Sequence, residues 1–134
     1  MSIRYNGDGG GNATRLRSVI RDMEYWKALF QRCEFTCKDF RELVPKLNDR
    51  NDNGIYCDPP WVEEGKIYQH SFDESDHVAL AELLRPFERT RIVVRYGDHP
   101  LIRELYVGWK VVEASSRTQQ RKTRPEIWLV NQAE

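Results

Sequence analysis

The sequence lacks any apolar run close to the roughly 20 residues that a membrane-spanning helix requires. Residues 1–11 are polar and rich in glycine, so they do not have the apolar centre of a secretory signal peptide. An excess of charge of one sign is also missing, because 21 Lys and Arg residues balance 21 Asp and Glu residues. This balance argues neither for nor against a nucleic-acid partner, which only a local basic cluster would indicate.

Cysteine is scarce, and the three present are Cys33, Cys37 and Cys57. An odd number does not suit a disulfide framework. Cys33 and Cys37 are four positions apart rather than three, and no second pair of ligands follows, so no zinc or other metal site is expected. Three reduced thiols are typical of a cytoplasmic protein, which is the location we expect.

What is present fits one globular domain. The chain has 134 residues, of which 40% are apolar and 11% aromatic, and this is enough for a single modest core. There is no internal repeat and no low-complexity tract. We expect a flexible, glycine-rich lead-in over residues 1–13 and one domain over residues 14–134.

Helical and strand signals alternate along this domain and indicate an α/β fold. The predicted elements are, in order, a helix over about 14–31, a strand over 34–37, a short helix that Asp39 begins and Pro45 limits, a strand over 55–57, a helix that begins at Asp73 or Ser75, a strand over 91–95, a short helix opened by Asp98 and Pro100, and strands over 109–114 and 126–130. Asp39 and Glu42 have the spacing of a capping box. Strands that alternate with helices predict a mostly parallel sheet with helices packed on it, closed by a C-terminal antiparallel hairpin.

The predicted strand over 55–57 stops at Asp58-Pro59-Pro60-Trp61. Two prolines cannot continue a central strand, so the chain leaves the sheet at a rigid corner. Ligands of open parallel sheets bind at the carboxyl ends of the strands, where Asp58 lies. The Asp58 carboxylate and the Pro59 carbonyl are two acceptors, and Trp61 offers a flat ring. Together they suit a planar amine, such as a nucleobase extruded from a duplex, although a purely structural corner is the plainer alternative.

Several segments resemble one known family. Gly54-Ile55-Tyr56-Cys57-Asp58-Pro59-Pro60-Trp61 resembles the catalytic motif of amino-methyltransferases that use S-adenosylmethionine. The segments that follow, Phe72-Asp73-x-x-Asp76-His77-x-x-Leu80-Ala81, Leu101-x-x-Glu104-Leu105-Tyr106 and Glu126-Ile127-Trp128-Leu129-Val130-Asn131, have spacings similar to the Dam-like (D12) class of DNA adenine methyltransferases. Cys37-Lys38-Asp39-Phe40 resembles the Asp-Phe element of that class, and the resemblance covers roughly residues 14–131.

The resemblance implies a partial Rossmann-like methyltransferase sheet and methyl transfer from S-adenosylmethionine to adenine N6 in double-stranded DNA, as in restriction-modification systems. It implies that Asp58, Pro59, Pro60 and Trp61 form the catalytic loop, and that Asp39 and Phe40 contact the adenine of the cofactor. Expected DNA contacts are Lys66 and Tyr68 in the loop after the motif, and Arg117, Arg121, Lys122 and Arg124 in the basic turn.

Three departures from the family pattern bear on this reading. The family usually has Tyr at the position of Trp61, and the same motif with Trp occurs in an RNA adenine methyltransferase class. Arg95-Tyr96 stands where relatives more often have a small residue. The family's Phe-x-Gly-x-Gly cofactor loop is absent, and the glycines of residues 6–11 do not follow an apolar strand, so they do not fit a cofactor cradle.

We therefore expect the C-terminal, catalytic part of a methyltransferase. The alternative is a non-catalytic remnant or subunit of a split enzyme, which binds DNA and needs a partner chain for the missing half. A half-sized sheet would leave one edge unpaired, which predicts self-association or partner binding.

Plainer readings stay open for several residues. Asp39 serves equally well as a helix N-cap alone, and the basic turn as a solvated hairpin. His77 reads as an ordinary first-turn helix residue, and Trp26 and Trp109 as core residues.

Overall fold

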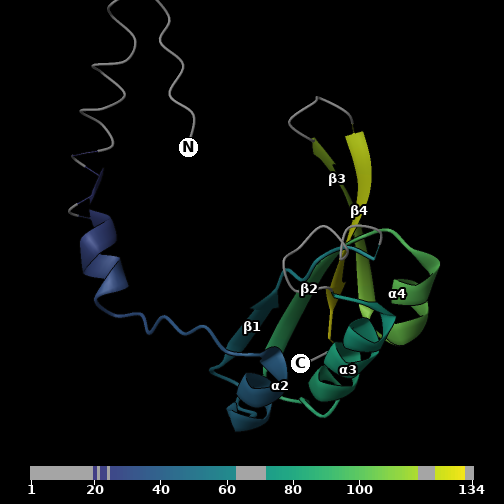
Figure 1. The fold of residues 1–134 in the computed structure, drawn as a ribbon, viewed down its shortest axis with the longest axis horizontal. Coiled ribbons are helices and arrows are strands. Elements are labelled where there is room, and N and C mark those ends of the chain that lie inside the picture. The colour runs from purple at the N-terminus through teal and green to yellow at the C-terminus, as the bar shows by residue number, and fades with distance from the viewer. Residues whose placement is uncertain (1–19, 21, 24, 63–71, 118–122, 132–134) are drawn as a thin grey trace, which may run out of the picture. The chain divides into compact units, whose positions relative to one another are not determined.

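The computed structural model describes residues 20, 22, 23, 25–62, 72–117 and 123–131. These residues belong to two compact units, residues 1–37 and 38–134, which are described separately (Figure 1).

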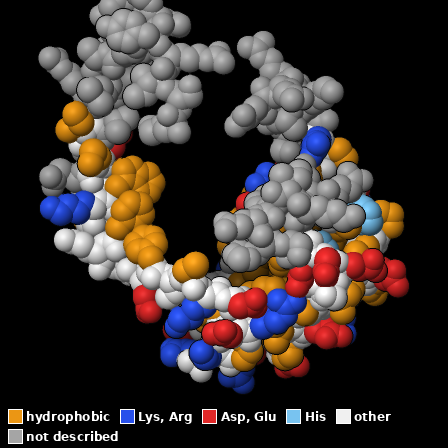
Figure 2. Space-filling model, in the orientation of Figure 1, with side chains coloured by type: hydrophobic (Ala, Val, Ile, Leu, Met, Phe, Trp, Pro, Cys, Tyr) orange, Lys and Arg blue, Asp and Glu red, His pale blue; other side chains and the backbone are white. Residues whose placement is uncertain are grey.

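In the first unit, residues 25–30 are helical, inside the helix predicted over 14–31, whose first residues lie outside the described part. Trp26 stacks on Phe30 with ring centroids 5.9 Å apart, and Phe30 meets Phe35 edge to face. Trp26 is 51% exposed, so the prediction that it is a core residue is wrong within this unit. Figure 2 shows hydrophobic side chains gathered along one side of this segment.

The strand expected over 34–37 does not form, because these residues have no strand conformation. A strand is stabilised by the hydrogen bonds of a neighbour, and none of the described strands pairs with this segment. Local β-propensity alone therefore misled the prediction.

The second unit contains helices and strands in nearly the predicted order. They are α2 (Phe40–Leu43), the 3-10 helix η1 (Val44–Lys46), β1 (Gly54–Cys57), α3 (Glu74–Leu84), β2 (Arg91–Gly97), α4 (Pro100–Leu105), β3 (Lys110–Arg117) and β4 (Thr123–Val130). Asp73 begins α3 with a complete capping box to Asp76. Asp39 caps α2 through Arg41 N, so the expected box with Glu42 is not the cap that forms, and His99 rather than Asp98 caps α4.

The four strands form one sheet in the order β1-β2-β4-β3. β1 pairs with β2 in parallel, whereas β4 is antiparallel to both β2 and β3. The expected C-terminal antiparallel hairpin is confirmed, but the expected mostly parallel pairing is wrong. The reason is the place of the last strand. β1, β2 and β3 run in the same direction, but β4 runs the opposite way and inserts between β2 and β3, which makes two of the three pairings antiparallel.

Helices α3 and α4 pack against one face of this sheet (Figure 1). β2 alternates between buried and more exposed positions, as a strand with one covered face should. The buried residues form one core: Val44, Leu80, Ala81, Leu84, Ile92, Val94, Tyr96, Ile102, Tyr106, Ile127 and Leu129. Leu83, Phe87 and Trp109 pack against it while half-buried, and for Trp109 this agrees with its expected place in the core.

A polar network fixes the amino ends of β1 and β2. The Asp49 carboxylate accepts hydrogen bonds from the backbone N–H groups of Thr90 at 2.7 Å, Arg89 at 2.9 Å and Glu88 at 3.1 Å. The side chain of Asn131, after β4, accepts from Ile92 N at 2.7 Å and donates to the Thr90 carbonyl at 2.8 Å. The network therefore fixes the start of both strands.

Candidate active site

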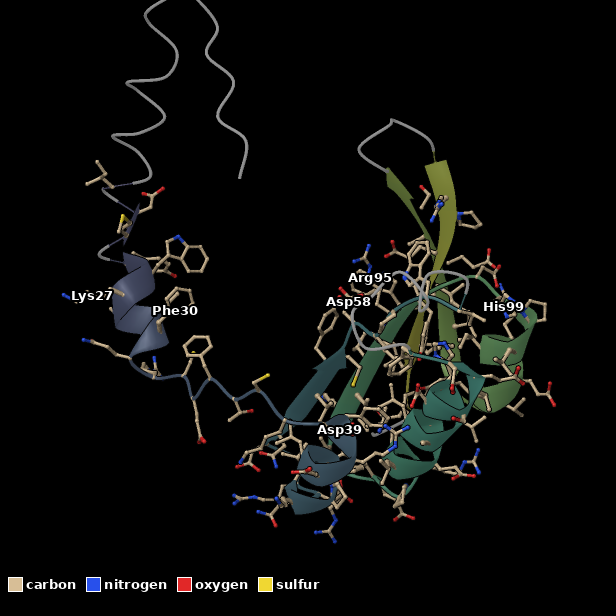
Figure 3. The ribbon with its side chains drawn as sticks, in the orientation of Figure 1. Lys27, Phe30, Asp39, Asp58, Arg95 and His99 are labelled. Atoms are coloured by element: carbon tan, nitrogen blue, oxygen red, sulfur yellow. The ribbon has the colours of Figure 1, made fainter. Side chains whose placement is uncertain are left out.

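Asp58 directly follows β1, at the carboxyl ends of the two parallel strands. The register pairs Cys57 with Val94, so Asp58 and Arg95 are neighbours at this edge (Figure 3). Asp58 Oδ2 lies 3.4 Å from Arg95 Nη1, and the Asp58 side chain is 47% exposed. A carboxylate with one long contact and an open side retains acceptor capacity for a ligand.

Arg95 is held from its other side by Glu126 of β4. Arg95 Nε and Nη2 each donate to one Glu126 oxygen at 2.8 Å, a bidentate pair. The Glu126 side chain is 5% exposed, and Trp128 Nε1 also donates to it. The hydrogen bonds that Arg95 donates to Glu126, more than any other cause, raise the pKa of Arg95 well above its usual value. The sequence showed Arg95 only as a departure from relatives, and no local signal pairs it with Glu126, which is 31 positions away.

Pro59, Pro60 and Trp61 complete the loop that Asp58 begins, and all three are half-buried. Trp61 lies so close to Gly97 that a Cβ atom at Gly97 would be 2.6 Å from Trp61 Cε3. The glycine that ends β2 therefore makes room for this ring. Sequence reasoning had assigned no role to Gly97, because nothing near it in the chain indicates the contact.

Trp61 lines a pocket of about 280 Å³ together with Val62, Gly97, Asp98, His99, Arg124 and Pro125. The guanidinium carbon of Arg124 lies 6.0 Å from the centre of the Trp61 ring. His99 Nδ1 accepts from Leu101 N at 3.2 Å, which leaves its other ring nitrogen as the N–H donor when the ring is neutral. The pocket thus combines an aromatic wall with a cation and polar groups.

Asp39 and Phe40 stand at the start of α2. Asp39 Oδ1 accepts from Arg41 N at 2.8 Å, so the N-cap role is observed, and its other oxygen has only a 3.5 Å contact, from the Arg41 side chain. Phe40 is half-buried, with its ring 5.8 Å from that of Phe72 and the Arg41 guanidinium 4.4 Å above it. An acceptor beside a partly exposed ring fits the adenine end of the expected cofactor.

His77 lies in the first turn of α3, as expected, and it is fully buried. Its Nδ1 is 2.9 Å from the Tyr96 hydroxyl, and its ring meets Phe72 edge to face at 4.7 Å. Burial is the main cause that lowers the pKa of His77, so the ring is neutral near pH 7. Phe40, Phe72, His77 and Tyr96 form a continuous row of ring contacts from α2 to the end of β2.

Part of the expected DNA contact surface lies outside the described residues: Lys66, Tyr68, Arg121, Lys122 and the side chain of Arg117. Arg124 of β4 is described, and it lies at the pocket beside Trp61. Among the described residues, no group of three or more His, Cys, Asp or Glu side chains is placed to hold a metal ion. In the same part of the chain, no helix is long and apolar enough to cross a membrane.

A family model described as D12 class N6 adenine-specific DNA methyltransferase matches residues 5–122. No curated protein matches the chain significantly. Because the family match covers most of the sequence, including the Asp58 loop, the chain belongs to the D12 class of N6 adenine-specific DNA methyltransferases.

Proposed function

We propose that this chain carries the catalytic part of an enzyme that transfers a methyl group from S-adenosylmethionine to N6 of adenine in DNA. Residues 14–134 would form that catalytic part, and residues 1–13 a lead-in. The observation that carries the proposal is the half-exposed Asp58 carboxylate, which stands at the carboxyl end of β1 close to the Trp61 pocket. A carboxylate acceptor beside an aromatic wall is what an extruded adenine requires.

The catalytic loop would hold the adenine at three points, two on its amine and one on its ring. One N6 hydrogen would be donated to Asp58 and the other to the Pro59 carbonyl, while Trp61 would stack on the ring. Accepting both hydrogens keeps the nitrogen lone pair out of conjugation with the ring and directs it at an electrophile. As N6 accepts the methyl group, Asp58 would take up one N6 proton and release it to solvent, while the electron pair of the broken bond would stay with the methyl donor.

The chain's own residues would hold only part of the cofactor. Asp39 and Phe40 fit its adenine, as acceptor and ring respectively. S-adenosylmethionine, when bound, supplies a methyl group activated by a positively charged sulfur. The sequence has no Phe-x-Gly-x-Gly segment for the methionine part. That contact would come from residues outside this sequence, in the same or another polypeptide.

DNA would lie against the basic turn and the loop after the catalytic motif. Arg117, Arg121, Lys122 and Arg124 would contact phosphates, and Lys66 and Tyr68 would close over the target nucleotide. Such contacts release counterions, so DNA binding should weaken steeply as salt rises. Arg124, which lies at the Trp61 pocket, supports this placement.

The decisive experiment compares two matched carboxylates. Tritiated methyl transfer would be measured on DNA that lacks N6-methyladenine, with RNA of the same sequence as a second substrate because of Trp61. Asp58→Asn should lower transfer to DNA by about 100-fold or more. Asp52→Asn, which alters an exposed carboxylate paired with Arg50 in the loop before β1, should leave it unchanged. Transfer that survives Asp58→Asn would overturn the proposed mechanism.

A second candidate is a subunit that needs a partner chain for activity. β1 is an edge strand that pairs only with β2 among the described strands, although it bears the catalytic loop. An open strand edge favours the addition of another strand. The absence of a Phe-x-Gly-x-Gly segment points the same way. Calorimetric titration with S-adenosylmethionine separates the two candidates, since the chain alone should bind it only if its own residues, or a second copy, complete the site.

A further inference from the structure

Three charged side chains stand in a row across three neighbouring parts of the sheet. Asp58 follows β1, Arg95 belongs to β2, and Glu126 belongs to β4. Arg95 bridges the other two, with 2.8 Å bonds to Glu126 and a 3.4 Å contact to Asp58. Its Nη1, the nitrogen that remains after the bidentate pair, is the one that reaches the catalytic carboxylate.

The charges of this row matter for the proposed chemistry. Methyl transfer makes the target nitrogen positive, and a negative carboxylate beside it favours that change. An uncompensated guanidinium next to Asp58 would oppose it, because like charges repel most strongly where water is scarce. Glu126, which is nearly buried, supplies the missing negative charge. The row therefore carries one net negative charge instead of none.

We propose that Arg95 is a positioning residue that fixes the orientation of the Asp58 carboxylate, and that Glu126 neutralises Arg95 so that the site stays negative. With Oδ2 held by Arg95, Oδ1 of Asp58 faces the target amine. This inference rests on the proposed methyl transfer and deepens it.

The geometry favours arginine for this task. Only a planar guanidinium can bind one carboxylate with two nitrogens and a second carboxylate with the third. Glu126 is itself fixed by the Trp128 indole, which donates to it. Trp128 also lies opposite Arg95 in the β2–β4 register and meets Tyr56 of β1 edge to face. The orientation of Asp58 thus depends on all three strands.

The first test needs no activity and uses the full chain. The guanidinium N–H resonances of Arg95 would be followed by nitrogen-15 NMR in the wild type and in Asp58→Asn. The Arg95 resonances should shift when Asp58 is neutralised. Asp98→Asn, which removes the partner of Arg103 instead, should leave them unchanged. Unchanged Arg95 resonances in Asp58→Asn would overturn the bridge, whatever the enzyme does.

The second test separates charge from structure. Glu126→Gln leaves the Arg95 charge uncompensated and should lower kcat about tenfold or more, with KM for DNA nearly unchanged. Adding Arg95→Gln restores one net negative charge but removes the guanidinium that orients Asp58, so the double variant should recover part of kcat and stay below the wild type. A merely structural pair would make the double variant no better than Glu126→Gln, and that result would overturn the proposal. Arg50→Gln with Asp52→Asn is the matched control, an exposed pair whose loss should not affect kcat.

If the wild type transfers no methyl group under any condition, the proposed function fails, and the NMR test still decides whether Arg95 holds Asp58.

Discussion

The two ends of the parallel β1–β2 pair use their carboxylates in opposite ways. At the amino ends, the Asp49 carboxylate accepts three backbone N–H groups, and Asn131 ties β2 to the chain after β4. At the carboxyl ends, Asp58 has one 3.4 Å contact with a side chain among the described residues, that of Arg95, and is half exposed. Polar groups saturated by the backbone fix the sheet, whereas an unsaturated carboxylate at a strand end remains available to a ligand. The comparison therefore assigns a stabilising role to the amino ends, and it leaves the carboxyl ends available for the proposed chemistry.

The largest stability effect is expected at the amino ends, from Asn131→Ala. The change leaves Ile92 N–H and the Thr90 carbonyl without their buried partner. Unsatisfied buried groups cost about 1–3 kcal/mol each, so we expect a loss of about 3 kcal/mol in the free energy of unfolding. Urea unfolding followed by circular dichroism measures it. Equal stability of variant and wild type would show that this network does not hold the sheet.

Replacing each of the two carboxylates by an amide sharpens the comparison. Asp49→Asn should lower the melting temperature, because an amide cannot accept all three backbone N–H groups as well as a carboxylate does. Asp58→Asn should hardly change it, because an exposed ion pair contributes little to stability. Methyl transfer, assayed at a temperature where both variants are folded, should fall much more in Asp58→Asn than in Asp49→Asn. A large drop in melting temperature for Asp58→Asn would contradict the division of roles.

A smaller effect is expected at Gly97, at the carboxyl end of β2. In Gly97→Ala the new Cβ would lie 2.6 Å from the Trp61 ring, so the ring must move. Overpacking of this kind costs about 1–3 kcal/mol, and displacement of Trp61 should lower methyl transfer as well. Gly54→Ala is the matched control in β1, since its nearest neighbour would be 3.8 Å away.

A double variant identifies the cause. If Trp61 mediates the effect, Trp61→Ala should remove the clash, and Gly97→Ala should cost little further activity in that background. An undiminished cost in the Trp61→Ala background would place the defect elsewhere.

Sequence reasoning succeeded where the signals are local. The end of β1 at Asp58 follows from the two prolines, α3 begins at Asp73 as its capping residues indicate, and the last two strands form the expected hairpin. The family resemblance was also confirmed, because it depends on short motifs at fixed spacings. These features are set by residues that are close together in the chain.

What sequence reasoning missed depends on contacts between distant residues. The insertion of β4 between β2 and β3 follows from tertiary pairing, which no strand signal encodes. Asp49 and Thr90 are 41 positions apart, and Arg95 and Glu126 are 31 positions apart. The strand predicted over 34–37 is the opposite error, a predicted element that does not form. Its residues favour a strand but have no described neighbour to pair with. The assignment of Asp58, Pro59, Pro60 and Trp61 to catalysis stays a prediction.

The smallest effect expected is a difference in acid sensitivity between the wild type and Asp49→Asn. Partial desolvation raises the pKa of Asp49, but the hydrogen bonds from Thr90, Glu88 and Arg89 outweigh it and hold that pKa below its usual value. A carboxylate with a lowered pKa in the folded state stabilises the fold above its unfolded pKa, near 3.9. That contribution is lost as the pH falls through the lower, folded value.

Asp73, whose capping bonds lower its pKa, and Asp98, paired with Arg103, add acid sensitivity that both proteins share. The difference in melting temperature between the wild type and Asp49→Asn should therefore be constant above about pH 5 and should shrink as the pH falls below that value. A gap that stays constant to pH 2 would mean that Asp49 acts through its shape and not through its charge.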